Sequence, residues 1–522
     1  MNTAELIDLL PGCTIRDDSE SLRQVNTATF QTQTRSRLIV QPRSTDDVVT
    51  VVQFAGRQQV TVYPISRGKN WGFGSKTPPA DCDILLDLSC MNAIRGYDTE
   101  FGTVRCEPGV TFRQLSRFLR DHGNRHFVSM IGGDPDASVV GNVLERGDGA
   151  GPYCERSKYA SALEVVLADG SVVVTGYGNI HNSRLADLAE SGIGPAFQEL
   201  FFQSSYGIVS CITLWLQPVP DYFRNFSFSQ TEAHSLAELL NVLRDLYRRR
   251  ILHDPITFWN DYKQIVAAMR YPYQLTGGQT PLARDFIKQH SNHYSTWYAF
   301  GGIFVDERAI GQRIIQTLFE KIRPHIRREH RWSRLSTRKI WWLRRLNRFA
   351  GFGRLNLDVL LQQWDHSPLL GYAGHTGSNA LYWRKKGAPP AELDPDRQMC
   401  GVLWNSFIVP FDGEMIARII QGVEAIVFRY QFEPILSFVV LNDRYIKVFQ
   451  QLLFDRENPV EDQTALACHQ DVFEYLEAAG CSHARLDILH MEREMLVSTV
   501  LNDKIKSALD PDGTIAPGRY FT

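Results

Sequence analysis

The stretch Tyr63-Pro-Ile-Ser-Arg-Gly-Lys-Asn-Trp-Gly-Phe-Gly-Ser75 follows directly after an apolar, β-branched run, Val60-Thr-Val62. This order predicts a strand that leads into a glycine-rich loop, whose bare backbone can approach a ligand closely. Successive amide groups in such a loop can form a concave site for an anion, most often a phosphate or a diphosphate. A glycine-rich surface turn gives the same pattern, so the loop alone leaves both interpretations open.

Two common nucleotide motifs do not fit this loop. A Walker loop has a glycine five residues before its Gly-Lys pair and Ser or Thr after it, whereas Gly68-Lys69 has Tyr63 and Asn70 at these places. A dinucleotide fingerprint has Gly or Ala three residues after Gly-x-Gly, and here that residue is Thr77. The loop therefore predicts a different kind of phosphate site.

A second glycine-rich region strengthens the ligand interpretation. It consists of Gly132-Gly-Asp-Pro-Asp-Ala-Ser-Val-Val-Gly-Asn142 and Glu145-Arg-Gly-Asp-Gly-Ala-Gly-Pro-Tyr153. With both regions, the chain resembles the vanillyl-alcohol oxidase and p-cresol methylhydroxylase family of FAD-linked oxidoreductases. The resemblance extends, in order along the chain, to Glu107-Pro-Gly109, Gly194-Pro195, Phe202-Gln-Ser-Ser-Tyr-Gly-Ile-Val209 and Leu509-Asp-Pro-Asp-Gly-Thr-Ile-Ala-Pro-Gly-Arg-Tyr520.

The resemblance implies an α+β fold with two domains. Residues 1–226 would form the FAD-binding domain, to which 489–522 return, and residues 227–488 would form a substrate or cap domain with a mixed sheet. The active site would lie where the cap meets the flavin. The residues that we expect to bind FAD are Pro64, Ser66, Arg67, Gly68, Lys69, Asn70, Trp71, Gly72, Pro108, Gly109, Asp136, Ala137, Ser138, Gly141, Asn142, Arg146, Gly147, Gly149, Gly207, Ile208 and Arg519.

Local patterns in the first two hundred residues also indicate mixed α and β structure. Leu38-Ile-Val40 predicts a strand, and Ser44-Thr-Asp-Asp47 predicts the capped start of a helix. Apolar residues at helical spacing predict a helix from Phe112 to Leu119, after a strand over Gly102–Cys106. Two apolar runs on either side of Asp169-Gly170 predict a β-hairpin.

Composition favours a large soluble enzyme. The chain has 522 residues, 43% of them hydrophobic, and a formal net charge of −2, which gives no general affinity for nucleic acid. The nine cysteines have no zinc-like spacing and make no complete disulfide framework, so we expect no metal. No apolar run is long enough to span a membrane, and the first residues do not read as a secretion signal. We therefore expect a cytoplasmic protein.

Two arginines are candidates for contact with the flavin. Arg485, in Cys481-Ser-His-Ala-Arg-Leu-Asp487, matches the arginine that in this family lies near the pyrimidine edge of the flavin and the substrate oxygen. An arginine there stabilises an anionic reduced flavin or a substrate oxyanion. Arg519, in the closing Pro-Gly-Arg-Tyr520, could face the flavin or simply be solvated.

The chain departs from the phenol-oxidising members of the family at two places. These members bind phenolate with tyrosines in the first loop and immediately before the arginine, where this chain has Phe73 and Ala484. A phenolate would lose hydrogen bonds worth roughly 1.5–3 kcal/mol each, which argues against a simple 4-alkylphenol as substrate. The arginine could still hold another oxyanion such as a carboxylate, and Phe73 could pack against a larger substrate.

Covalent attachment of the flavin is not expected. The region in which relatives carry the attaching histidine or tyrosine reads Cys400-Gly-Val-Leu-Trp-Asn-Ser-Phe-Ile-Val-Pro410. His375 and Tyr382 are nearby in sequence, but a polar loop residue and a packing aromatic are the simpler interpretations. We expect non-covalent FAD, with Cys400 as the remaining candidate for a bond.

Two acidic residues are candidates for a general base. Asp134 and Asp136 lie in the second glycine-rich region, and either could accept a proton if burial raises its pKa. Asp-Pro-Asp is also ordinary turn chemistry, and this favours a structural role for Asp136 more than for Asp134.

A basic, tryptophan-containing run from Arg323 to Arg348 is the last notable segment. A solvated helix face is the first interpretation. The second is a docking surface for an acidic partner, for a carrier protein with its phosphopantetheine arm, or for an anionic membrane surface. A homodimer is a further open expectation.

The sequence thus predicts an FAD-dependent oxidoreductase. It would remove a hydride from a C–H bond next to oxygen, nitrogen or an aromatic ring of a small organic substrate, with oxygen or a protein as the final electron acceptor. Two alternatives stay open: a flavoenzyme of specialised metabolism that acts on a bulky or carrier-tethered substrate, and a flavin-binding scaffold without turnover. The residues expected to carry the chemistry are Arg485, Asp134 and Phe73.

Overall fold

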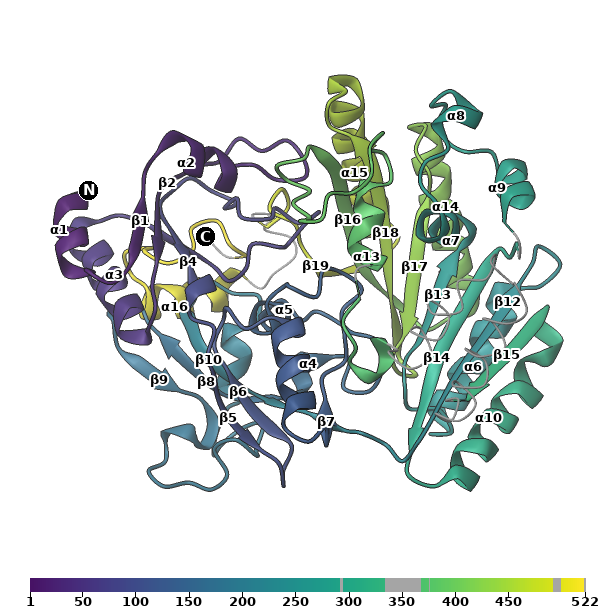
Figure 1. The fold of residues 1–522 in the computed structure, drawn as a ribbon, viewed down its shortest axis with the longest axis horizontal. Helices are drawn as coiled ribbons and strands as arrows, with labels where there is room; N and C mark the ends of the chain where they lie inside the picture. The colour runs from purple at the N-terminus through teal and green to yellow at the C-terminus, as the bar shows by residue number, and fades with distance from the viewer. Residues whose placement is uncertain (292–293, 334–367, 375, 492–498, 521–522) are drawn as a thin grey trace, which may run out of the picture.

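Two small sheets and one large sheet form the framework of the chain in the computed structural model (Figure 1). The structure describes residues 1–291, 294–333, 368–374, 376–491 and 499–520. The small sheets lie in the left half of Figure 1 and the large sheet in the right half. The fold is α+β, which confirms the predicted fold class. The first small sheet mixes parallel and antiparallel pairs, whereas the large sheet, which is predicted to be mixed, has only antiparallel pairs among the described residues.

The first small sheet carries the predicted glycine-rich loop. Its strands, in spatial order, are β1 (Thr14–Arg16), β2 (Ser36–Gln41), β4 (Cys82–Asp87) and β3 (Val62–Ile65). Strands β2 and β3 both pair with β4 in parallel orientation, and β1 pairs with β2 in antiparallel orientation. Helix α3 (Thr45–Gln58) follows β2 and begins with a capping box between Ser44 and Asp47, as the sequence predicts.

The second small sheet continues the same part of the chain. Its strands, in spatial order, are β5 (Ile94–Asp98), β6 (Thr103–Cys106), β10 (Ile208–Trp215), β8 (Ala160–Val166) and β9 (Val172–Val174). The antiparallel pairing of β8 with β9 confirms the predicted hairpin. A short pair, β11 (Gln217–Pro218) with β7 (His126–Phe127), leads toward the large sheet.

The large sheet, called the cap sheet below, has eight antiparallel strands. In spatial order they are β15 (Arg328–Ser333), β12 (Tyr222–Gln230), β14 (Trp297–Val305), β13 (Ile256–Asn260), β17 (Ile435–Val440), β18 (Tyr445–Asp455), β16 (Cys400–Pro410) and β19 (Ser482–Arg485). The strand order mixes early and late segments, so that Arg485 ends at one edge, beside β16.

Helices surround the sheets. Those of the first part are α1 (Thr3–Leu9), α2 (Ser19–Val25), α4 (Phe112–Asp121), α5 (Val139–Leu144) and α16 (Thr499–Leu509). Those next to the cap sheet are α6 (Leu236–Arg248), α7 (Asp261–Ala268), α8 (Tyr273–Thr276), α9 (Arg284–His290), α10 (Arg308–Ile322), α13 (Thr376–Asn379), α14 (Gly413–Arg429) and α15 (Pro459–Ala478). Short 3₁₀ turns span Leu88–Cys90, Arg156–Tyr159, Gly176–Asn179, Phe197–Phe201, Arg323–His325, Pro368–Leu370 and Ala380–Tyr382.

The two faces of the cap sheet differ in what covers them. On β16, Leu403 and Phe407 belong to the hydrophobic core that the sheet forms with α6, α10, α14 and α15. Residues with the opposite parity, such as Trp404 and Ser406, therefore point to the other face, which we call the inner face. The inner face contacts the glycine-rich loops, because the indole of Trp404 lies against Gly72.

The C-terminal tail returns to the first small sheet. The amide of Val62 donates to the carbonyl of Thr514 at 2.8 Å, and the amide of Ala516 donates to the carbonyl of Val62 at 2.8 Å. Figure 1 shows this end of the chain, in yellow, near β4. The division at residues 226 and 488 stays a prediction.

No helix within the described residues is both long enough and apolar enough to cross a membrane. Most of the basic run, from Arg334 to Arg348, lies outside the described residues. In its described part, Arg323 forms an ion pair with Glu329 at 3.1 Å.

Candidate flavin and substrate site

The first glycine-rich loop is held against the inner face of the cap sheet. Gly72 has φ of +83°, and a Cβ atom there would lie 2.1 Å from Cδ1 of Trp404, so only glycine fits. The amide of Trp404 donates to the carbonyl of Gly72 at 3.3 Å. The amides of Phe73 and Ser75 both donate to the carbonyl of Asn70, which fixes the loop's curvature.

The second glycine-rich region lies directly beside the first loop. A Cβ atom on Gly141 would lie 2.4 Å from Oγ of Ser66, so the Ser66 side chain packs directly against the backbone of Gly141. Nζ of Lys69 forms an ion pair with Asp134 at 3.1 Å, and the Asp134 side chain is only 2% exposed. The two segments predicted to close around one ligand are therefore neighbours in space.

A buried carboxylate, Glu145, joins segments that are far apart in the sequence. It pairs with Arg519 of the tail and with Nε of Arg485 at 3.1 Å, and it accepts a hydrogen bond from Tyr520 at 2.7 Å. Burial alone would raise the pKa of Glu145, but the charges of Arg519 and Arg485 and the Tyr520 hydrogen bond hold it below its ordinary value. Arg519 also donates to the hydroxyl of Tyr63 at 3.2 Å.

This group, called the Glu145 cluster, carries one excess positive charge. Two guanidinium groups face a single carboxylate, and burial raises the pKa values of Tyr63 and Tyr520, which keeps both phenols neutral. An excess positive charge in a buried site favours an anionic ligand or a ligand that becomes anionic during the reaction.

Arg485 connects the Glu145 cluster with the first loop. Its Nη2 donates to Oδ1 of Asn70 at 2.6 Å, and its guanidinium lies 4.5 Å from the centre of the Phe73 ring. A guanidinium has five N–H donors, so Arg485 has further capacity for a substrate or flavin oxygen. Arg485 and Phe73, two of the three residues expected to carry the chemistry, are thus in contact.

Strand register places a row of side chains on the inner face, starting from Arg485. Arg485 pairs with Ser406, Ser406 with Phe449, Phe449 with Ser437, and Ser437 with Trp259. Neighbouring strands lie about 4.8 Å apart, so the row extends for roughly 19 Å across the sheet. Phe449 and Trp259 keep accessible surface, whereas the residues on either side of them in sequence are buried. The row therefore presents two accessible aromatic side chains on the inner face, separated by the buried Ser437.

A buried ion pair joins the second glycine-rich region to the inner face. Nζ of Lys447 lies 2.8 Å from Asp148, and both side chains are about nine-tenths buried, at 8% and 11% exposed. Burial raises the pKa of Asp148, and the neighbouring Lys447 only partly offsets this. Sequence reasoning missed this pair, although a lone lysine in the apolar strand β18 was a usable signal.

Three buried polar side chains, His469, Asp487 and His490, are hydrogen-bonded to one another at the end of the strand that carries Arg485. Asp487 lies 2.8 Å from Nε2 of His469 and 3.0 Å from Nδ1 of His490. Burial alone would raise the pKa of Asp487, but the two histidines hold it far below its usual range. Residues of these types can bind a metal ion, but the short distances are those of hydrogen bonds, and so we interpret the group as a structural brace.

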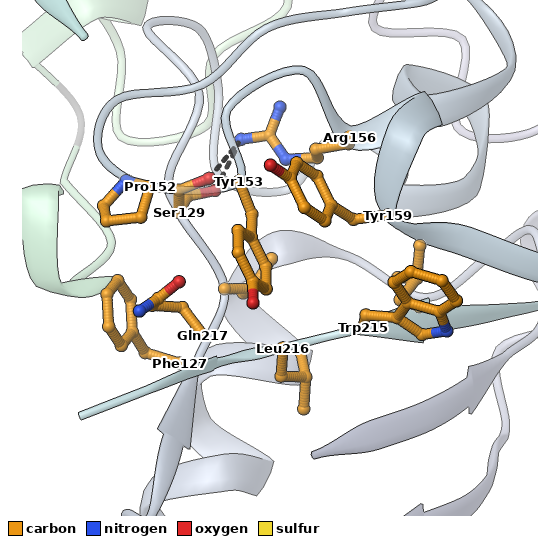
Figure 2. A pocket seen from close by; sticks show the side chains of 11 residues that line it. Phe127, Ser129, Pro152, Tyr153, Arg156, Tyr159, Trp215, Leu216 and Gln217 are labelled. Carbon is orange, nitrogen blue, oxygen red and sulfur yellow. Dashed lines mark hydrogen bonds between the residues drawn. The ribbon is translucent and has the colours of Figure 1, made fainter. Parts of the chain in front are cut away.

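A small cavity lies behind the second glycine-rich region (Figure 2). Its volume is about 20 Å³, enough for a water molecule but not for a substrate. Figure 2 shows Arg156 next to it, bonded to Ser129, while the rings of Tyr153 and Tyr159 stack at 3.9 Å. Arg156 also donates to Oδ1 of Asn142 at 2.7 Å, so this buried arginine links two parts of the second glycine-rich region. Sequence reasoning missed Arg156 as well.

A larger hollow of about 550 Å³ opens beside the first loop. It is lined by Arg23, Lys69, Pro390, Glu392, Leu393, Asp394, Arg397 and Gln398. Its volume falls within the range of ligand pockets, and Lys69 belongs to the predicted flavin-binding residues. The hollow is therefore a candidate entrance to the space between the loops.

Other predicted flavin-binding residues lie in varied surroundings. The carbonyl of Pro108 accepts a hydrogen bond from Ser138 at 2.6 Å, which joins Pro108 and Gly109 to the second region. Arg146 pairs with Glu199 near the surface, and Ile208 lies in the core of β10. Asp136 forms an ion pair with Arg113 at 2.7 Å. The roles of all these residues stay predictions.

Cys400, Tyr382 and His375 are the residues considered for a covalent bond to the flavin, and the structure describes the first two. Burial raises the pKa of the Cys400 thiol to about 12, and a protonated thiol is a poor nucleophile. Tyr382 is 3% exposed in an aromatic cluster, and its hydroxyl donates to Gln398. His375 lies outside the described residues. These surroundings fit non-covalent binding, which stays a prediction.

Comparisons with known proteins agree with this geometry. Residues 36–176 match the model of an FAD binding domain. The chain is 34% identical, over 97% of its length and 94% of the relative, to 1'-carboxy-chondrochloren decarboxylase of Chondromyces crocatus. It is 24% identical, over 91% of its length and 85% of the relative, to the 4-cresol dehydrogenase [hydroxylating] flavoprotein subunit of Pseudomonas putida. A crystal structure of p-cresol methylhydroxylase with bound substrate superposes with a TM-score of 0.85 at 23% identity, covering 99% of this chain and 95% of that one.

The chain is an FAD-dependent oxidoreductase. It belongs to the vanillyl-alcohol oxidase and p-cresol methylhydroxylase family. The residues present fit the cofactor, because the close contact of Ser66 with Gly141 brings two loops of bare backbone together, and the Glu145 cluster supplies positive charge beside them.

Proposed function

We propose that this enzyme catalyses an oxidative decarboxylation of an N-acyl aromatic amino acid or a similarly bulky carboxylic acid. The substrate loses a hydride from the carbon next to its aromatic ring and carbon dioxide from the neighbouring carbon. The electron pair of the broken carbon–carboxylate bond forms a carbon–carbon double bond, and FAD is the oxidant. The substrate is oxidised by two electrons, which pass later to oxygen or to a protein acceptor.

The Glu145 cluster is the observation that carries the redox part of this proposal. Its excess positive charge lies where Arg485 meets the first loop. When bound there, FAD supplies a ring that accepts the hydride and becomes an anion. Arg485 and Arg519 would stabilise that negative charge without having to move.

The decarboxylation part is supported by the relative that shares 34% identity over 97% of the chain and whose name states that it removes a carboxyl group. The side chains next to Arg485 agree with a substrate other than a simple phenol. Phe73 and Ala484 offer no hydroxyl groups to a phenolate, and Phe449 and Trp259 have accessible apolar surface against which an acyl group could pack.

The first and second glycine-rich regions would hold the cofactor. Backbone amides of the two loops and the amine of Lys69 would donate hydrogen bonds to its diphosphate, and Asn70 links the first loop to Arg485. Asp134 keeps Lys69 in place through their ion pair.

Anaerobic mixing of the purified holoenzyme with N-octanoyl derivatives of tyrosine, phenylalanine and tryptophan tests the proposal. We expect the yellow flavin to bleach and one carbon dioxide to be released for each flavin reduced. Arg485→Ala should suppress bleaching while FAD stays bound, and Arg249→Ala, an exposed arginine that pairs with Asp245 next to helix α6, serves as the matched control. Bleaching without carbon dioxide would reject the decarboxylation, and bound flavin that no carboxylic acid in the panel reduces would favour a scaffold.

A further inference from the structure

A lysine without an acidic partner lies on the inner face of the cap sheet. Lys263, on α7, donates from Nζ to Oε1 of Gln451 at 2.9 Å, and Nζ lies 5.2 Å from the centre of the Trp404 ring. Both partners are uncharged. Among the described residues, no carboxylate lies within ion-pair distance of Lys263.

Two other largely buried lysines, Lys447 and Lys506, each form an ion pair with a carboxylate. Nζ of Lys447 lies 2.8 Å from Asp148, and Nζ of Lys506 lies 2.6 Å from Asp510. A buried ammonium without a counterion is unfavourable, because desolvation penalises the charge and nothing nearby offsets the penalty. Burial lowers the pKa of Lys263 to about 8, and no charged neighbour contributes to that shift.

Lys263 nevertheless keeps accessible surface, as do Trp404 and Phe449. The accessible surface of Lys263, beside Trp404, is the space that a ligand could enter. The surrounding cluster is aromatic and apolar, with Tyr262, Tyr382 and Trp383 among its members. An anionic ligand that enters this space would therefore meet one uncompensated positive charge.

Lys263 lies well apart from Arg485 on the inner face, so the two cations can bind different groups of one substrate. Gln451 is the partner of Trp404 in the sheet, and Arg485 is the partner of Ser406, two residues further along the same strand. Two strand spacings and two residues separate Gln451 from Arg485, which gives roughly 12 Å between their Cα atoms. Arg485 is already paired with Glu145, whereas Lys263 has no such partner.

We propose that Lys263 binds the carboxylate of the substrate and holds it on the inner face of the cap sheet, away from Arg485. This proposal rests on the proposed function, because it assigns the departing carboxylate of that reaction. Trp404 separates Lys263 from the first loop, so its indole can pack against the aromatic ring of the same substrate. Lys263 is then the residue that selects carboxylic acids.

Equilibrium binding to the holoenzyme tests this assignment. The probes are N-octanoyl-L-phenylalanine and N-octanoyl-2-phenylethylamine, which differ only in the carboxylate. The flavin is reduced beforehand with dithionite under anaerobic conditions, so that it cannot accept a hydride from the acid, and the readout is the heat of binding. A charge-assisted hydrogen bond predicts a preference of roughly tenfold or more for the acid. Lys263→Met should reduce this preference to less than about threefold, whereas Lys288→Met, a surface lysine paired with Glu232, should leave it unchanged.

A measurement without substrate gives a second readout. Removal of an uncompensated buried charge should leave the melting temperature of Lys263→Met equal to or above that of the wild type. Lys506→Met, which leaves Asp510 unpaired, should melt at a lower temperature. Thermal scans of both holoenzymes in one buffer make the comparison.

Three results would overturn the assignment: no preference for the acid in the wild type, a preserved preference in Lys263→Met, or destabilisation of Lys263→Met equal to that of Lys506→Met. Failure of the proposed function looks different. In that case the acid would still bind through Lys263, but no carbon dioxide would be released.

Discussion

The variant Glu145→Gln should lower the free energy of unfolding by more than the loss of one carboxylate from a surface ion pair would. Glu145 is the acid that faces Arg485 and Arg519, and it also accepts the Tyr520 hydroxyl at 2.7 Å. Glutamine keeps the volume and one acceptor oxygen but leaves two buried guanidinium groups without an anion. Breaking a buried ion pair in this way typically costs about 3–5 kcal/mol, and the retained acceptor favours the lower end, about 3 kcal/mol.

Urea unfolding of the holoenzyme at pH 7, followed by tryptophan fluorescence, measures this loss. The matched control is Glu199→Gln, because Glu199 pairs with Arg146 at 2.6 Å near the surface, where an ion pair is worth less than about 1 kcal/mol. Equal midpoints for the two variants would refute the reasoning, because the cluster would then contribute no more than a surface pair.

The pH dependence of the same experiment follows from the depressed pKa of Glu145. A carboxyl whose folded-state pKa lies below its unfolded value stabilises the fold above the unfolded value, and this contribution is lost as the pH falls through the folded one. The difference between the wild type and Glu145→Gln should therefore be full at pH 7 and shrink below about pH 4.5. A difference that does not change with pH would contradict the assignment of the cluster's charge.

Three further predictions concern the loops and the chamber. Gly72→Ala should be isolated without FAD, because its Cβ would lie 2.1 Å from Trp404, and the visible absorbance after gel filtration measures this; a fully yellow variant would contradict it. Arg485→Ala should slow anaerobic flavin reduction by roughly 10²–10³-fold with FAD retained, as for loss of a donor to a developing anion, and unchanged stopped-flow rates would remove Arg485 from the mechanism. Lys263 loses its charge as the pH rises through about 8, while Gln451 and Trp404 do not titrate there. The affinity of the dithionite-reduced holoenzyme for N-octanoyl-L-phenylalanine should therefore fall above that pH in the wild type but not in Lys263→Met, and an unchanged affinity in the wild type would contradict this.

Local signals in the sequence were sufficient for much of the fold. The capping box at Ser44 and Asp47 and the hairpin around Asp169-Gly170 are both present, because such turns and caps depend on a few neighbouring residues. The glycine-rich loops were recognisable because close backbone contact excludes every side chain, as Gly72 shows.

The interior of the site was less predictable. Glu145 and Arg519 are more than 370 positions apart, and nothing local to either residue indicates the other. Lys263 and Asp148 reach the inner face only through the register of a sheet whose strand order mixes early and late segments. The expectation that Asp134 or Asp136 acts as a base rested on position alone, and both form ion pairs, with Lys69 and Arg113.

Binding of FAD to the purified chain tests the account most directly, because every step above depends on two loops that close around that cofactor. We expect the protein to be isolated yellow, with close to one FAD per chain, and we expect acid precipitation to release the flavin into solution. A correctly folded protein that is colourless and fails to bind added FAD in a calorimetric titration would contradict the account.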